Sequence, residues 1–175
     1  MGTQKEHVLL LHGYTGHGIT MKIMEGFFKE NSDYTVHTVS YLSLFRSPHQ
    51  ILKVLSDNLN KKFNKDDVVN IVGHSLGGIL ARCLACGGHL SFNVKRVVTI
   101  GSPHRGTSLA TNLLEVGVFR DLVPMVTALS KSSSFIRSLP KINVEMGSIA
   151  GKKKYDLPIR TYSVDIPNNR RRCHT

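Results

Sequence analysis

The stretch that decides the fold is Val68–Arg82, which reads VVNIVGHSLGGILAR. Its apolar first half predicts a buried strand and its second half predicts a helix, so Ser75 falls on a sharp turn between them. Such a turn needs neighbours without side chains, which here are Gly73 and Gly77. The turn would expose the serine hydroxyl and place the N–H of Leu76 at a helix N-terminus, where it can bind an oxyanion. Ser75 is therefore a candidate nucleophile.

Two further apolar stretches end in loops that belong at the same edge of a sheet. Residues 6–15 read EHVLLLHGYT and predict a strand followed by a loop in which the N–H of Tyr14 is the second candidate oxyanion donor. We expect His12 to shape this loop by hydrogen bonding and not to transfer protons. Residues 97–107 read VVTIGSPHRGT, another buried strand, which brings His104 to that edge.

Strands and helices alternate along the first hundred residues. Strands are expected at 7–12, 34–42, 68–73 and 94–101, and helices at 20–31, from 48 onward and at 76–87. Ser47 is the expected N-cap of the second helix. Two helical faces support this order: Met21, Met24, Phe27 and Phe28, and then Ile51, Leu52, Leu55, Leu59 and Phe63. The alternation predicts an α/β fold with a mostly parallel central sheet and helices on both faces.

Three segments together carry a resemblance to a known family. In order, LLLHGYTG, VNIVGHSLGG and VVTIGSPHRGT resemble the α/β-hydrolase fold, and within it the lipase- and esterase-like members. The resemblance covers residues 6–110, and INVEMGSIAG at 142–151 is similar to the next core strand of those proteins. It implies an acyl hydrolase with a Ser-His-Asp triad, in which the acid and then the histidine follow the serine. The length of the chain by itself suits one domain over residues 1–175.

The end of the chain departs from the family pattern. Asn169 stands where an aspartate is expected, so either the acid is displaced to Asp165 or the chain lacks the last strand or strands of the fold. Of the histidines after the serine, only His174 follows a plausible acid in the order Ser, Asp, His. Asp165 and His174 are therefore the provisional acid and base. We expect His104 to belong to a structural or pocket loop.

Residues 107–140 interrupt the alternation with two apolar helical stretches and a serine-rich turn. Two interpretations stay open. The segment is either a mobile cap or lid that lines an acyl pocket, or a pair of ordinary packing helices.

Composition limits the class of protein. The 175 residues carry a net charge of +11 and three cysteines, of which Cys83 and Cys86 read as buried helix residues and not as metal ligands. With no signal peptide or apolar span evident, a cytoplasmic protein is expected. The charge favours a solvated basic surface first and association with anionic membranes second. We expect no cofactor, no metal, no nucleic acid and no obligate protein partner.

These observations together predict a serine hydrolase that cleaves small-molecule or lipid carboxylic esters through an acyl-enzyme on Ser75. Two alternatives remain. A catalytically impaired binding protein with the α/β-hydrolase fold would explain the unusual tail, and an acyltransferase would use the same serine with an alcohol acceptor in place of water.

Overall fold

The computed structural model describes residues 6–14, 16, 21–107, 124–152 and 161–165, the last five as backbone only. The strands are β1 (Glu6–Leu11), β2 (Thr35–Val39), β3 (Val68–His74), β4 (Asn93–Ile100), β5 (Glu145–Lys152) and β6 (Thr161–Asp165). The helices are α1 (Lys22–Asn31), α2 (Pro48–Lys62), α3 (Leu76–Cys86), α5 (Pro124–Ala128) and α6 (Ser134–Arg137).

One sheet carries the fold, with the strand order β2-β1-β3-β4-β5-β6. The first five strands are parallel, and β6 runs antiparallel to β5. Central strands that are buried on both faces must be apolar throughout, and four consecutive residues of β1 and five of β3 are buried. The expected mostly parallel α/β sheet is confirmed. Its parallel strands all end at one edge, where their loops meet.

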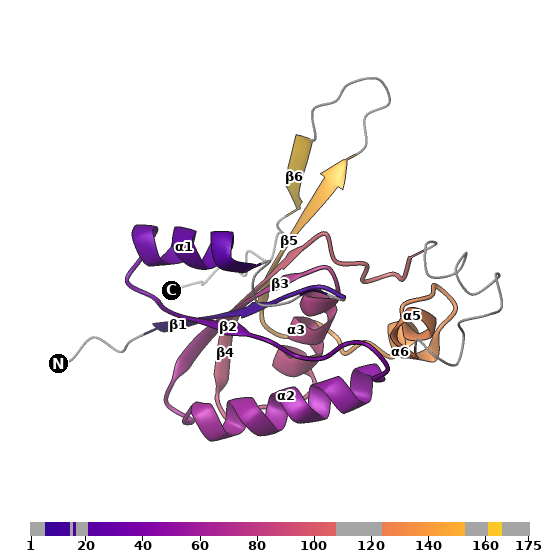
Figure 1. Ribbon diagram of the computed structural model, residues 1–175, viewed down its shortest axis with the longest axis horizontal. Helices are drawn as coiled ribbons and strands as arrows, with labels where there is room; N and C mark the ends of the chain where they lie inside the picture. The colour runs from indigo at the N-terminus through magenta and orange to yellow at the C-terminus, as the bar shows by residue number, and fades with distance from the viewer. Residues whose placement is uncertain (1–5, 15, 17–20, 108–123, 153–160, 166–175) are drawn as a thin grey trace, which may run out of the picture.

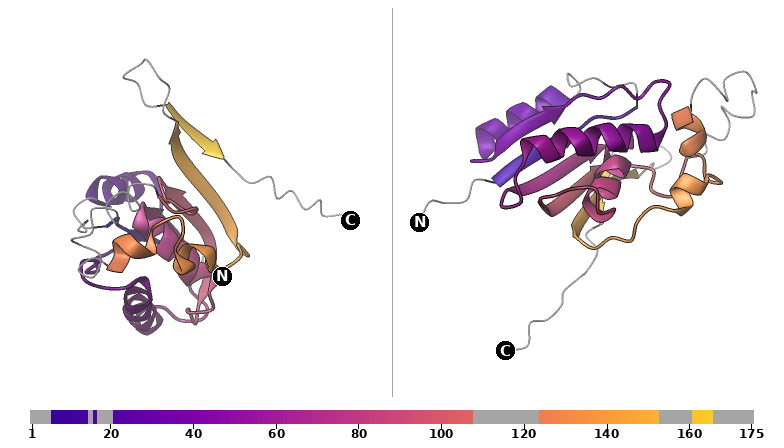
Figure 2. Two further views of the ribbon diagram at one scale, coloured as in Figure 1. Left: turned by 90° about the vertical axis from the view of Figure 1, so that its right-hand side faces the viewer. Right: turned by 90° about the horizontal axis from the view of Figure 1, so that it is seen from below.

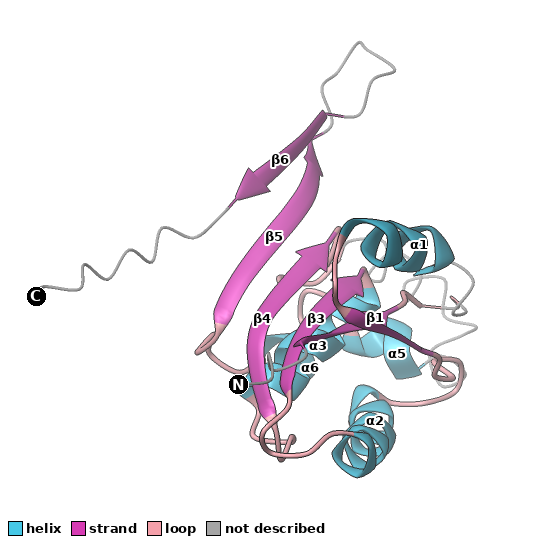
Figure 3. Cartoon of the chain, turned by 90° about the vertical axis from the view of Figure 1, so that its left-hand side faces the viewer, coloured by secondary structure: helices cyan, strands magenta, loops and turns pink. Residues whose placement is uncertain are grey.

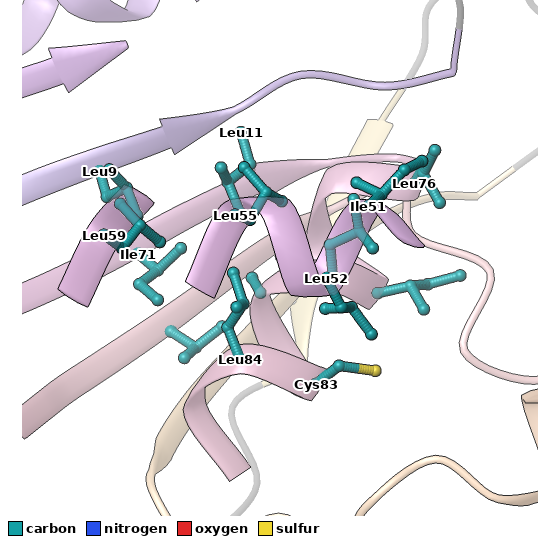
Figure 4. Close-up of a cluster of buried hydrophobic side chains, with 14 of the residues drawn as sticks. Leu9, Leu11, Ile51, Leu52, Leu55, Leu59, Ile71, Leu76, Cys83 and Leu84 are labelled. Atoms are coloured by element: carbon teal, nitrogen blue, oxygen red, sulfur yellow. The ribbon is translucent and has the colours of Figure 1, made fainter. Parts of the chain in front are cut away.

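Helices cover both faces of the sheet, as the alternation predicts (Figure 1). On one face, α1 packs with Met21, Val8, Leu10 and Val72. On the other, α2 and α3 form the main core with the opposite side chains of β1 and β3, and α5 and α6 add to it. Figure 4 shows this core, in which Leu55 and Leu59 of α2 point toward Leu9 and Leu11 of β1. Burial of each such side chain contributes about 1.5–3 kcal/mol.

Helix α2 begins where the sequence places it. Ser47 accepts a hydrogen bond from the N–H of Gln50, and the Gln50 side chain accepts one from the N–H of Ser47, which completes a capping box. The expected apolar face of the helix is buried in full, Phe63 included. This fixed start determines how the preceding loop, residues 40–47, leaves the sheet.

Two local expectations are wrong. Phe27 is 60% exposed, whereas Met24 and Phe28 of the same helix pack against the core cluster on this face of the sheet. The second strand ends at Val39 and not at residue 42, because Tyr41 turns back onto His12 of the neighbouring strand's loop. Strand pattern alone gives no sign of this contact.

The edge of the sheet beyond β4 differs from the rest. β5 pairs with β4 through Ile149 and then continues with β6 alone, so the two strands form a hairpin that projects from the body (Figures 2 and 3). Gly101 donates a backbone hydrogen bond of 2.8 Å to the Ile149 carbonyl, which anchors the loop after β4 to the base of this hairpin.

The second half of the 107–140 segment packs against the body. Met125, Phe135 and Ile136 are buried in the main core, and Ser133 caps α6 through the N–H of Ile136. Residues 124–137 thus pack as core helices. The first half, residues 108–123, lies outside the described residues, and the cap stays a prediction.

Candidate active site

Ser75 sits at the tight turn between β3 and α3, with φ 53° and ψ −117°. Such a backbone conformation costs a residue with a side chain about 1–3 kcal/mol and persists only where the surroundings enforce it. Here the N–H of Ser75 donates to the Ile100 carbonyl at 2.8 Å, and the Ser75 carbonyl accepts from the N–H of Gly78 at 3.1 Å. The turn is held from both the neighbouring strand and the following helix, and the Ser75 side chain remains partly exposed.

The two flanking glycines are required by close backbone approach. A Cβ atom at Gly73 would lie 2.4 Å from the backbone of Gly77, and one at Gly77 would lie 2.2 Å from the carbonyl oxygen of Leu11. Any side chain at either position would push α3 away from the ends of β1 and β3. The spacing read from the sequence therefore has a steric cause.

The loop after β1 lies directly against the elbow. A Cβ atom at Gly13 would be 3.2 Å from the Cβ of Ser75 and 3.3 Å from Nδ1 of His74. Tyr14 is the next residue, so its backbone N–H belongs to the peptide unit that begins at Gly13. The structure thus brings together Ser75, the N-terminal residue Leu76 of α3 and the Tyr14 loop.

His12 holds this loop in place. Its ring is fully buried; Nε2 accepts a hydrogen bond from the N–H of Tyr41 at 3.2 Å, so Nδ1 carries the proton and donates to the Gly13 carbonyl at 2.8 Å. The same carbonyl accepts from the N–H of Gly16 at 3.1 Å. With both ring nitrogens engaged, His12 has the loop-shaping role expected of it.

The orientation of the Gly13–Tyr14 peptide follows from these bonds. In a trans peptide the N–H points opposite to the C=O. Because the Gly13 carbonyl is turned to the His12 ring and to Gly16, the N–H of Tyr14 points out of the loop. Burial raises the pKa of the Tyr14 side chain, so its hydroxyl stays protonated at neutral pH.

Tyr41 contacts the loop beside Ser75, which the sequence analysis did not predict. Its ring stacks on His12 with centroids 4.0 Å apart and an interplanar angle of 11°, and its hydroxyl donates to the His12 carbonyl. Burial raises the pKa of Tyr41, so this donor keeps its proton. No sequence signal links residues 12 and 41, because the contact arises only when β2 pairs beside β1.

His104 lies beside the helix that follows the elbow. Its Nε2 is 3.2 Å from Oγ1 of Thr99, and its Nδ1 is buried without a partner among the described residues. Burial, with a smaller effect from Arg82, lowers the pKa of His104 and favours the neutral ring. This environment suits a structural histidine on the α3 side of β4.

Within the described residues, neither the provisional acid, Asp165, nor the provisional base, His174, is placed next to Ser75. The backbone of Asp165 is aligned with Ser148 at the end of β6, three strands from β3 and so about 14 Å across the sheet. Its side chain and all of His174 lie outside the described residues. Both assignments stay predictions.

The described residues contain no group of three or more His, Cys, Asp or Glu side chains that could hold a metal ion. Cys83 is buried inside α3, and burial raises the pKa of its thiol to about 12, so it is a packing residue in a protonated state.

The chain matches the PGAP1-like alpha/beta domain family over residues 21–164. It belongs to this family. The match spans β3, the elbow, α3 and β4, and it begins after β1. No curated protein sequence matches the chain.

Solved structures show which fold the PGAP1-like domain has. The mature lipase BlEst2 of Bacillus licheniformis is 21% identical, over 78% of this chain and 58% of that one, with a TM-score of 0.57. A metagenomic carboxyl esterase, MGS0156, is 14% identical over 86% and 51%, with a TM-score of 0.63. The phospholipase PlaB of Legionella pneumophila is 15% identical over 77% and 35%, with a TM-score of 0.60.

These likenesses establish the α/β-hydrolase fold of the chain. The chain spans between about a third and three-fifths of the length of these three structures. Among the helices that the structure describes, none has the length and apolar character needed to cross a bilayer.

Proposed function

We propose that this chain cleaves carboxylic esters through an acyl-enzyme formed on Ser75. The observation that carries the proposal is the strained backbone of Ser75, a positive φ held at the N-terminus of α3. Strain of this kind collects at functional sites, and this one lifts a hydroxyl out of the sheet edge. The lipase, esterase and phospholipase names of the structural neighbours agree with ester chemistry.

In the proposed mechanism, Ser75 Oγ attacks the ester carbonyl and a histidine takes the serine proton. The N–H groups of Leu76 and Tyr14 donate to the oxyanion that develops on the carbonyl oxygen. The histidine then protonates the leaving alcohol and activates a water that releases the acid. The apolar composition of residues 109–136 favours a substrate with an apolar acyl chain over a charged one.

His174 with Asp165 is the proposed base and acid. The nine residues from Asp165 to His174 can span up to about 30 Å when extended, more than the width of three strand spacings. The tail can therefore reach the elbow from the end of β6. An aspartate beside the imidazole would stabilise the imidazolium formed in the reaction.

Labelling with a fluorophosphonate probe at neutral pH tests the nucleophile and the base together. We expect rapid labelling of the wild type, none of Ser75→Ala and little of His174→Ala. Ser102→Ala is the matched control, because Ser102 follows β4 as Ser75 follows β3 but does not adopt a positive φ. Labelling that survives in His174→Ala would move the base to another histidine, with His104→Ala tested next.

Two further results would change the assignment. A folded wild-type protein that is not labelled would indicate a binding protein that retains the fold without a working triad. Transfer products that form when alcohol acceptors are added, at the expense of free acid, would indicate an acyltransferase. A panel of esters of increasing acyl length would contradict the lipid-like substrate if only acetyl or strongly polar esters were cleaved.

A further inference from the structure

Exposed apolar side chains lie on the connection between β2 and α2 and on the first half of α2. They are Leu42, Leu44, Phe45 and Val54, whose exposed fractions are 54%, 36%, 66% and 41%. Phe45 and Val54 line one hollow, and Leu42 and Leu44 lie in the same loop as Phe45. Apolar side chains gathered at the surface of a folded domain mark a place where a partner binds. We name these four residues the β2–α2 patch.

Phe45 is the most exposed of the four and also the most strained. Its φ is 58°, and among the described residues only Ser75 shares a positive φ without being glycine. An aromatic residue in this region costs about 1–3 kcal/mol, which burial of the ring does not offset here. A strained backbone that presents a large apolar side chain to solvent indicates a binding partner outside the domain.

The surroundings of the patch are basic. Phe45 and Val54 line an open hollow together with Arg46, Gln50 and Lys53, and no acidic side chain lines it. Lys53 contacts Asp57 one turn along α2 at 2.9 Å, but both side chains are more than half exposed, so this pair is weak. Apolar side chains beside exposed cations match a lipid surface with anionic headgroups.

The patch is placed next to the elbow. It follows Tyr41, which stacks on His12 in the loop that contacts Ser75. β2 and β3 are separated only by β1, so the loops at their ends start about 10 Å apart. Figure 1 shows the β2–α2 connection curving around this end of the sheet.

We infer that the β2–α2 patch docks the domain on an anionic lipid bilayer, with Leu42 and Phe45 entering the interface and Arg46 and Lys53 contacting the headgroups. The docking is independent of catalysis; only its role in presenting a lipid ester to Ser75 rests on the proposed function. A partner protein is the less favoured occupant, because the net charge of +11 adds a general attraction to anionic surfaces.

Co-sedimentation with vesicles tests the apolar half of the inference. The vesicles are phosphatidylcholine alone or phosphatidylcholine with phosphatidylserine, and we expect binding to the second kind only, decreasing as salt is added. Leu42→Ser with Phe45→Ser should weaken binding at least about tenfold. Phe27→Ser is the matched control, since Phe27 is 60% exposed on α1; it should bind like the wild type.

A second pair of variants tests the basic half. Each cation near an anionic surface contributes about a fivefold change in affinity, so Arg46→Glu with Lys53→Glu should weaken binding at least about 25-fold. Lys61→Glu with Lys62→Glu makes the same change in charge at the other end of α2, on exposed residues, and should have a much smaller effect.

Several outcomes would overturn the inference. They are no binding of the wild type to anionic vesicles, equal losses in Phe27→Ser and in Leu42→Ser with Phe45→Ser, or equal losses in the two charge-reversal pairs. Self-association of the wild type that Phe45→Ser abolishes would instead identify a second copy as the occupant. Ser75→Ala should bind vesicles normally, so failure of ester cleavage and failure of docking are told apart.

Discussion

The contact between Tyr41 and His12 predicts the behaviour of Tyr41→Phe. The substitution keeps the ring and its stacking on His12 but removes the hydroxyl that donates to the His12 carbonyl. A buried carbonyl that loses its donor costs about 1–3 kcal/mol of stability. For a domain of this size, that corresponds to a melting temperature lower by roughly 2–12 °C.

The same substitution should also lower kcat for ester hydrolysis. The carbonyl of His12 and the peptide of Gly13 are consecutive, so a loosened loop leaves the N–H of Tyr14 less well aimed at the oxyanion. Complete loss of one such donor costs about 10²–10³ in kcat. We expect about a tenfold lower kcat for Tyr41→Phe with KM nearly unchanged, because the donor acts on the transition state more than on the bound ester.

Thermal unfolding and steady-state ester hydrolysis, measured on the same preparations, check both parts. Tyr34→Phe is the matched control: Tyr34 is partly buried against α1, its hydroxyl has no hydrogen-bond partner in the described part of the chain, and its loss should change stability by less than about 0.5 kcal/mol. Equal stability and equal kcat of Tyr41→Phe and wild type would refute the argument. If Tyr41→Phe lowers stability but leaves kcat unchanged, Tyr41 stabilises the fold without contributing to the reaction.

Three further predictions concern other parts of the molecule. Gly77→Ala would place a methyl group 2.2 Å from the Leu11 carbonyl oxygen of β1 and should lower the free energy of unfolding by at least about 1–3 kcal/mol. Gly26→Ala would place its methyl group with no atom within 4 Å and should raise the free energy of unfolding by about 0.5–1 kcal/mol. Urea titration of both variants measures the two changes. Burial, with neighbouring positive charge, lowers the pKa of His37 from 6.5 to about 4. The fold therefore favours the neutral ring, and its contribution to stability, complete above about pH 6.5, should decline by about 1–2 kcal/mol toward pH 4 after allowance for solvent screening; a His37→Gln variant with the same acid dependence would contradict this. Cys83, with a pKa of about 12, should react with iodoacetamide far more slowly than the partly exposed Cys86 at pH 8, which peptide mass mapping measures.

Much of the fold could be predicted because the strands are buried on both faces. Buried strands require continuous apolar residues, as in β1 and β3, and the helices between them show their period in residues such as Leu55 and Leu59. The end of β2 was wrong by three residues, since residues 40–42 are shaped by the His12 ring and not by their own strand propensity. The expected burial of Phe27 was wrong, because helical spacing indicates which residues share a face but not how many of them the sheet covers.

The sequence by itself predicted the elbow: glycines at positions 73 and 77 around Ser75 lie between an apolar strand and a helix, and a Cβ at Gly73 would meet the nearby backbone of Gly77. Only the tertiary structure shows why position 77 must be glycine, because a Cβ there would meet the Leu11 carbonyl of β1. The sequence could not reveal Tyr41, because stacking and hydrogen bonding between residues 12 and 41 exist only after β2 has paired with β1. Nor could it reveal that Phe45 stands exposed in a left-handed backbone while other apolar residues nearby are buried. Residues close together in the sequence determine the geometry of a local turn. The exposure of a side chain and its long-range contacts depend instead on which elements the folded sheet brings together.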